Sequence, residues 1–133
     1  MYAVHSQFDA HAHARAWLDD RLNGTDRVGL PWGALLAFVR LSASPRVVTR
    51  PMGLAEATSV VRAWLELGVT WTPQPTERHA QTLAGLLARE SQADLVPDVH
   101  LAALAIEHGL TLCSTDRDFA RFDGLRWTDP LAS

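Results

Sequence analysis

The sequence has 133 residues, of which 47% are hydrophobic and 20% charged, with a net charge of -3 and one cysteine. A chain of this length buries roughly two thirds of its unfolded surface, which predicts a single domain over residues 1–133 with a core that needs no metal or disulfide. A lone cysteine cannot form an internal disulfide, and the start of the sequence has no signal-like or membrane-spanning pattern, so a cytoplasmic protein away from membranes is expected.

The basic residues exclude two classes of enzyme. All twelve are Arg, and the sequence has no Lys. A P-loop needs a lysine on the transferring phosphates, and Schiff-base chemistry needs an amine. Because the net charge is negative, any contact with RNA or DNA would depend on a local patch or a bound metal.

Helical patterns and short apolar runs alternate along the chain. The predicted helices cover residues 10–22, 32–41, 54–67, 76–91 and 97–108, and the predicted strands cover 27–30, 69–72, 110–114 and 125–127. No hairpin turn signal joins the strands, so each pair is connected through a helix. This alternation predicts the α/β class, with a parallel sheet covered by helices.

Acidic residues gather at one predicted edge of the sheet. Asp98 lies in the first turn of a helix, and Asp116 directly follows the next strand. Since that helix and strand run in opposite directions, both carboxylates are expected on the rim where α/β proteins place ligands. Asp118 is close enough to join them, as is Asp94. Clustered carboxylates without lysine suit Mg²⁺ or Mn²⁺, and a cation held in this way supports hydrolysis of a phosphodiester.

Simpler interpretations exist for the same residues. Asp98 also fits a helix N-cap or first-turn acid, and Asp116 and Asp118 fit the opening of a short helix. None of the six histidines has the spacing of a zinc site, so surface or helix-end positions are expected for them. Cys113 sits within an apolar strand and is expected to be a buried thiol.

The segment LVPDVHLAALAIEHGLTLCSTDRDFARFDGLRW, residues 95–127, closely resembles the C-terminal signature of PIN-domain ribonucleases, specifically the VapC toxins of toxin-antitoxin pairs. The shared pattern is an Asp that opens a helix, then E-H-G, an apolar strand, T-D-x-D-F and a last short strand. A weaker resemblance extends upstream, where residues 2–22 look like the family's first connection and second helix.

The resemblance implies a PIN-like three-layer sandwich, in which a central parallel sheet has helices on both faces. It further implies an endoribonuclease that depends on Mg²⁺ or Mn²⁺ and acts on tRNA, rRNA or mRNA. Asp98 and Asp116 would be its catalytic acids, and Asp98, Asp116 and Asp118 its metal ligands. Its partners would be a VapB-type antitoxin and a second copy of the chain.

Two features depart from the family pattern. The family begins with an apolar strand that ends in an Asp, whereas this sequence starts at Met1, so the first strand and the first metal acid are expected to be missing. The family's second acid should fall between Trp32 and Arg40, where Leu35 and Ala37 are the nearest candidates for its place. Three interpretations follow: an active nuclease whose full chain starts upstream, a remnant that only binds an antitoxin, or another small metal-dependent hydrolase such as a phosphatase.

Overall fold

The computed structural model describes residues 2–5, 18–46, 50–114 and 116–129. Its five strands form one parallel sheet in the order β3-β2-β1-β4-β5. The strands, listed in chain order, are β1 (Tyr2–His5), β2 (Val28–Gly29), β3 (Thr70–Trp71), β4 (Thr111–Ser114) and β5 (Arg126–Thr128). The predicted α/β class with a parallel sheet is confirmed.

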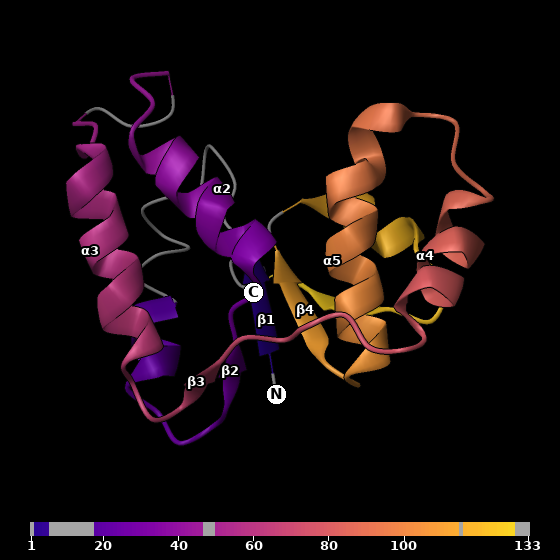
Figure 1. The fold of residues 1–133 in the computed structure, drawn as a ribbon, viewed down its shortest axis with the longest axis horizontal. Helices are drawn as coiled ribbons and strands as arrows, with labels where there is room; N and C mark the ends of the chain where they lie inside the picture. The colour runs from indigo at the N-terminus through magenta and orange to yellow at the C-terminus, as the bar shows by residue number, and fades with distance from the viewer. Residues whose placement is uncertain (1, 6–17, 47–49, 115, 130–133) are drawn as a thin grey trace.

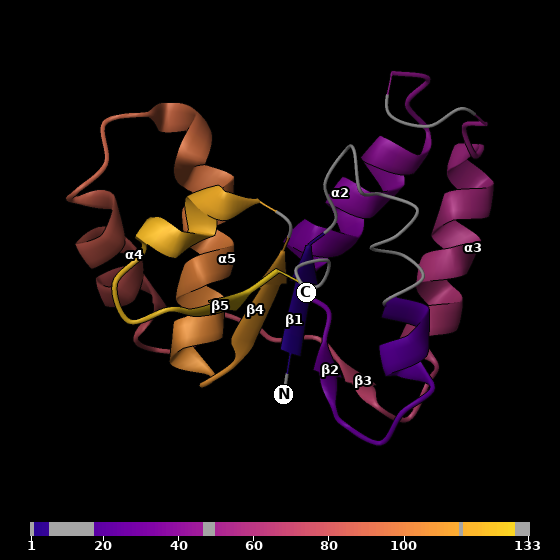
Figure 2. The ribbon, with the colours of Figure 1, turned by 180° about the vertical axis from the view of Figure 1, so that it is seen from behind.

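Helices connect the strands and flank the sheet. Figure 1 shows α2 (Trp32–Ser42) and α3 (Leu54–Leu65) on one side of β1, and α4 (His79–Leu87) and α5 (Val96–Glu107) on the other. Two short 3-10 helices, η1 (Ala93–Leu95) and η2 (Arg117–Arg121), precede α5 and follow β4. The view from behind in Figure 2 shows β5 at the outer edge of the sheet beside β4.

The core has two parts because β4 is covered on both faces. Leu112 and Cys113 are neighbours on this strand, so their side chains point to opposite faces of the sheet. Leu112 packs in a buried cluster with residues of α5 and η2, and Cys113 packs in another with residues of α2 and α3. The expectation of a buried thiol at Cys113 is confirmed, because this residue is 0% exposed.

The strand expected to be missing is present. Residues Tyr2–His5 form the central strand β1. The resemblance to the family had assigned them to a connection before a helix. They pair in parallel with β2 and with β4, for example Ala3 with Gly29 and with Leu112. Without them, the facing backbone groups of both neighbours would lack partners at about 1 to 3 kcal/mol for each buried group. A segment containing Tyr and Val suits this position.

Helix α5 brings the acidic segment to the sheet. Pro97 lies in its first turn, where proline's missing N–H costs no hydrogen bond. Its middle turns are buried: Val99 and the apolar run from Leu101 to Ala105 are all buried residues. The helix ends at Glu107, and Gly109 follows shortly after it with a φ of +66°, in the left-handed region that glycine adopts without strain. The chain then enters β4, so the start of α5 and the end of β4 lie at the same rim.

Within the described ranges, none of the helices combines the length and the apolar composition that crossing a bilayer requires.

Candidate active site

A cavity of about 280 Å³ opens between α2 and the start of α5. Its wall on the α2 side consists of Gly33, Ala37 and Arg40. Asp94 of η1 and the first turns of α5 form the other wall, with Asp98 and His100 among the lining residues. The cavity therefore combines two carboxylates, one guanidinium and one imidazole.

Asp98 is the acid most affected by this environment. Burial and the negative charges of Asp116, Asp118 and Asp94 together raise its pKa from 3.8 to about 6. The carboxylates predicted to meet at the rim are thus within electrostatic reach of one another. A carboxylate in such surroundings is stabilised by any cation that approaches it.

Asp116 and Asp118 lie at the start of η2, outside the cavity wall. Asp116 caps this short helix, and its Oδ1 accepts a hydrogen bond of 2.9 Å from the backbone N–H of Asp118. Asp116 is half-buried and Asp118 is exposed. The simpler interpretation of Asp116 as a capping residue is confirmed, and it leaves the second carboxylate oxygen of Asp116 outside this hydrogen bond.

The described part of the chain contains no group of three or more His, Cys, Asp or Glu side chains placed to hold a metal ion. Carboxylate oxygens are the donors that Mg²⁺ and Mn²⁺ prefer, so the chemistry of Asp98, Asp116 and Asp118 fits such a cation. Their electrostatic proximity also fits it, but the three side chains are not gathered around one point.

Two residues of α2 were candidates for the place of the family's second acid. Of the two candidates, Leu35 is 2% exposed and packs in the core with α3, whereas Ala37 lines the cavity. Of these two candidates, Ala37 is therefore the one that lines the same cavity as Asp98.

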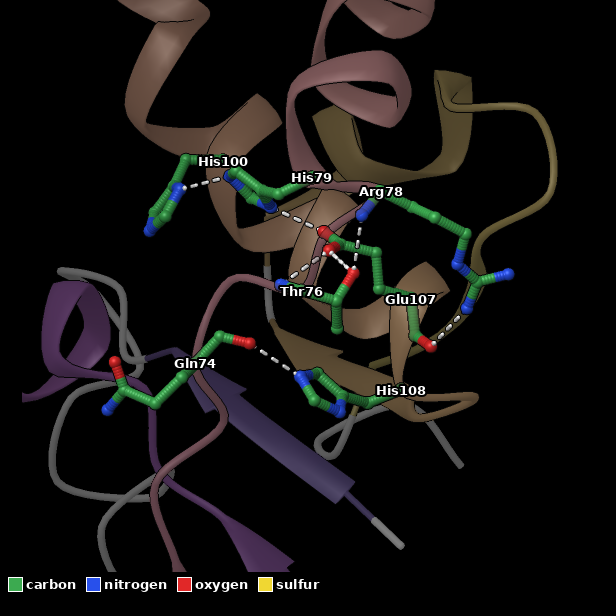
Figure 3. A network of polar contacts seen from close by, with 7 residues as sticks. All are labelled: Gln74, Thr76, Arg78, His79, His100, Glu107 and His108. Atoms are coloured by element: carbon green, nitrogen blue, oxygen red, sulfur yellow. Dashed lines mark hydrogen bonds and ion pairs between the residues drawn. The ribbon is translucent and has the colours of Figure 1, made fainter.

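A hydrogen-bonded network behind the cavity was not predicted (Figure 3). The Glu107 side chain is 1% exposed and accepts hydrogen bonds from Thr76 and from Nδ1 of His79. Nε2 of His79 then lies 3.1 Å from Nδ1 of His100. The expectation of surface or helix-end positions is wrong for His100, which is partly buried within α5. His79 does lie at a helix end, the start of α4, but its side chain is only 13% exposed. His11 and His13 lie outside the described residues.

The network holds Glu107 in its charged form. Burial alone would raise the pKa of this carboxyl group, but the hydrogen bonds from Thr76 and His79 outweigh it, and the pKa falls below its ordinary value. Burial and the neighbouring His79 lower the pKa of His100. The only sequence signal for this arrangement was an acid at the buried end of an apolar helix, which needs a partner.

Comparison with known proteins agrees with the geometry. The PIN domain family matches residues 2–125. Ribonuclease VapC37 of Mycobacterium tuberculosis is 44% identical to the chain, and the match spans 99% of this chain and 92% of that protein. Ribonuclease VapC33 of the same species is 42% identical, with 98% and 92% of the two chains covered.

Solved structures share the fold at low sequence identity. The structure of VapBC-1 from nontypeable Haemophilus influenzae superposes with a TM-score of 0.67 at 13% identity, covering 99% of this chain and 100% of that one. DNA-bound VapBC from Salmonella typhimurium gives a TM-score of 0.63 at 17% identity, covering 98% and 99%. From the family match and the 44% identical relative, the chain belongs to the PIN-domain family, among the VapC proteins.

Proposed function

We propose that this protein is the toxin of a toxin-antitoxin pair and that it is an endoribonuclease. The observation that carries the proposal is the cavity between α2 and α5, where Asp98 is held among other carboxylates in a chain 44% identical to a protein named a ribonuclease. The resemblance to VapC toxins points to tRNA, rRNA or mRNA as the substrate.

The reaction would use Mg²⁺ or Mn²⁺. Asp98, Asp116 and Asp118 are the residues that would hold the ion, which when bound lowers the pKa of a water molecule and shields phosphate charge. The donor chemistry supports this choice, as do the burial and the neighbouring negative charges that raise the pKa of Asp98. Asp98 and Asp116 are the acids on which the chemistry would depend most.

The other cavity residues suit a nucleic-acid strand. Arg40 is exposed on α2 at the cavity wall, where its guanidinium can pair with a phosphate oxygen in a bidentate manner. Gly33 and Ala37 lie on the same α2 wall and add no large side chain to it. Arg40 would place a backbone phosphate beside Asp98, and the small residues would allow the strand to approach.

The partners follow from the same relationship. Three solved structures that share this fold are VapBC proteins, two of them bound to DNA, which supports a VapB-type antitoxin as partner. A homodimer and a cytoplasmic location complete the proposal, since the resemblance implies paired subunits and RNA is the target.

One comparison of substrates tests the reaction class. The purified chain is incubated with an end-labelled RNA or with p-nitrophenyl phosphate, each with Mn²⁺ and with EDTA. Cleavage of RNA that requires Mn²⁺, without release of nitrophenol, is expected. Hydrolysis of the phosphomonoester alone would replace the nuclease with a phosphatase, and RNA cleavage in EDTA would refute the metal.

A second candidate function is based on the carboxylates that do not surround a common point. Because no three potential ligands meet in the described residues, the chain could act as a remnant that binds an antitoxin without cleaving RNA. Co-purification with a VapB-type antitoxin, together with RNA that stays intact in Mn²⁺, would favour this function over the nuclease.

A further inference from the structure

The path from Glu107 to the cavity determines which nitrogens carry protons. Glu107 Oε1 accepts a hydrogen bond of 3.0 Å from the backbone N–H of Thr76 and a second one from its hydroxyl group, and Oε2 faces Nδ1 of His79. A carboxylate can only accept, so Nδ1 of His79 must be the donor. In its neutral form, His79 then has an unprotonated Nε2.

The same reasoning continues to His100. The unprotonated Nε2 of His79 is an acceptor, so Nδ1 of His100, 3.1 Å away, carries the proton of that ring. Its own Nε2 is then left with a free lone pair. With His79 neutral, the tautomer of His100 is thereby set by Glu107, through one intervening ring.

The free nitrogen of His100 faces the cavity. His100 lines the cavity together with Asp98 and Gly33, and Figure 3 shows its second nitrogen turned away from His79. A Cβ placed on Gly33 would lie 3.9 Å from Cδ2 of His100, the carbon bonded to Nε2. This edge of the ring thus lies within van der Waals distance of a residue without a side chain.

We propose that His100 is a substrate-contacting residue, whose Nε2 accepts a hydrogen bond from a ribose 2′-hydroxyl group of RNA, and that Glu107 and His79 are positioning residues that fix its tautomer. This inference rests on the proposed ribonuclease function. The 2′-hydroxyl group is the donor that separates RNA from DNA at any given nucleotide. An acceptor next to Asp98 would therefore add selectivity for ribose at the site of cleavage.

The first experiment reads the tautomer without any activity. Proton-coupled ¹⁵N spectra of His-labelled protein are recorded for the wild type and Glu107→Gln, with the His100 signals identified by their loss in His100→Phe. The wild type should show His100 protonated at Nδ1. In Glu107→Gln the side-chain amide donates to Nδ1 of His79, which reverses both hydrogen bonds, so His100 should become protonated at Nε2. A wild-type His100 protonated at Nε2, or one that does not respond to Glu107→Gln, overturns the relay.

The second experiment reads the contact with RNA. Values of kcat/KM are compared for an all-ribose oligonucleotide and for oligonucleotides that carry one 2′-deoxy substitution at each position around the cut. For the wild type, a 2′-deoxy substitution at one position should lower kcat/KM by about 2- to 10-fold, the range expected for one hydrogen bond. His100→Phe should abolish this preference, whereas His100→Gln, which retains an acceptor near the place of Nε2, should restore part of it.

Matched controls separate the contact from a structural effect. His108→Phe changes a histidine that bonds the carbonyl oxygen of Gln74 and is not a lining residue of the cavity, so it should keep the wild-type preference. Equal ribose preference in His100→Phe and in the wild type would refute the contact while leaving the nuclease intact. A wild type that cleaves no RNA would instead refute the proposed function, and the tautomer measurement would still decide the relay.

Discussion

Replacing Asp98 with Asn should stabilise the folded protein at neutral pH while it removes activity. The carboxyl group is half-buried among Asp116, Asp118 and Asp94, and its pKa is raised from 3.8 to about 6. Above that pH the folded protein holds a charge that the unfolded chain carries more easily in water. Asn has nearly the same shape and no charge, so this unfavourable term disappears.

The magnitude and sign follow from the two pKa values. Each pKa unit corresponds to about 1.4 kcal/mol, so ionised Asp98 costs the folded protein at most about 3 kcal/mol. Between about pH 4 and pH 6 the folded state binds more protons at this group than the unfolded state. The stability of the wild type should therefore fall as the pH rises through this window, and the contribution of Asp98 to that fall should be absent in Asp98→Asn.

Urea denaturation near pH 4 and near pH 7.5 measures this difference. The free energy of unfolding of Asp98→Asn should exceed that of the wild type by about 1 to 3 kcal/mol near pH 7.5. Near pH 4 the two free energies should differ little. Asp123→Asn, which alters an exposed carboxylate paired with Arg89, is the control and should change stability by less than about 1 kcal/mol at either pH. A variant less stable than the wild type near pH 7.5, or one with the same gain at both pH values, would refute the reasoning.

Three further changes test the cavity and the core. Ala37→Glu adds a carboxylate to the cavity wall and should tighten Mn²⁺ binding in calorimetry; unchanged affinity would show that this wall is remote from the ion. Phe119→Ala removes a ring that is 0% exposed and packs against Phe122, so urea denaturation should report a loss of about 3 to 5 kcal/mol, and a loss below about 1 kcal/mol would contradict its burial. Cys113 is fully buried with its pKa raised to about 12, so a thiol reagent should label it only after unfolding, and rapid labelling of the native protein would disprove this.

Much of the fold could be predicted because local signals and tertiary packing agree. Pro31 precedes α2, Pro97 lies in the first turn of α5 and Gly109 follows the end of α5, and each residue type matches the backbone at that point. The positions of Asp98 and Asp116 at one rim followed from topology alone, since a helix and the next strand of a parallel sheet run in opposite directions. Burial raises the pKa of Asp98, and the negative charge of the nearby Asp116 raises it further.

The central strand escaped prediction because its position depends on its neighbours. Tyr2–His5 is only four residues long, and no hydrophobic pattern of that length distinguishes a strand from the start of a helix. What places it in the sheet is the pairing of both its edges with β2 and β4. The resemblance to the family assigned these residues to a connection. In the structure they instead supply backbone partners to β2 and β4.

The network behind the cavity was missed for a similar reason. Thr76, His79 and Glu107 are spread over 31 residues, and their hydrogen bonds depend on how α4 packs against α5. Periodicity indicates which face of a helix is buried, but not which polar groups meet across the interface. The helix expected to begin at Thr76 begins at His79, and Thr76 instead hydrogen-bonds Glu107 and the backbone of Arg78.

The most direct test of the proposed function compares the cleavage of one end-labelled RNA by the wild type and by Asp98→Asn, both purified in the same way and supplied with Mn²⁺. The wild type should cut the RNA, and the variant should be slower by about 100-fold or more. Replacing even a group that only supports a metal ligand lowers metal affinity or activity by about 10- to 100-fold. Equal rates for the two proteins would contradict a ribonuclease site at Asp98, and intact RNA with both would contradict a ribonuclease.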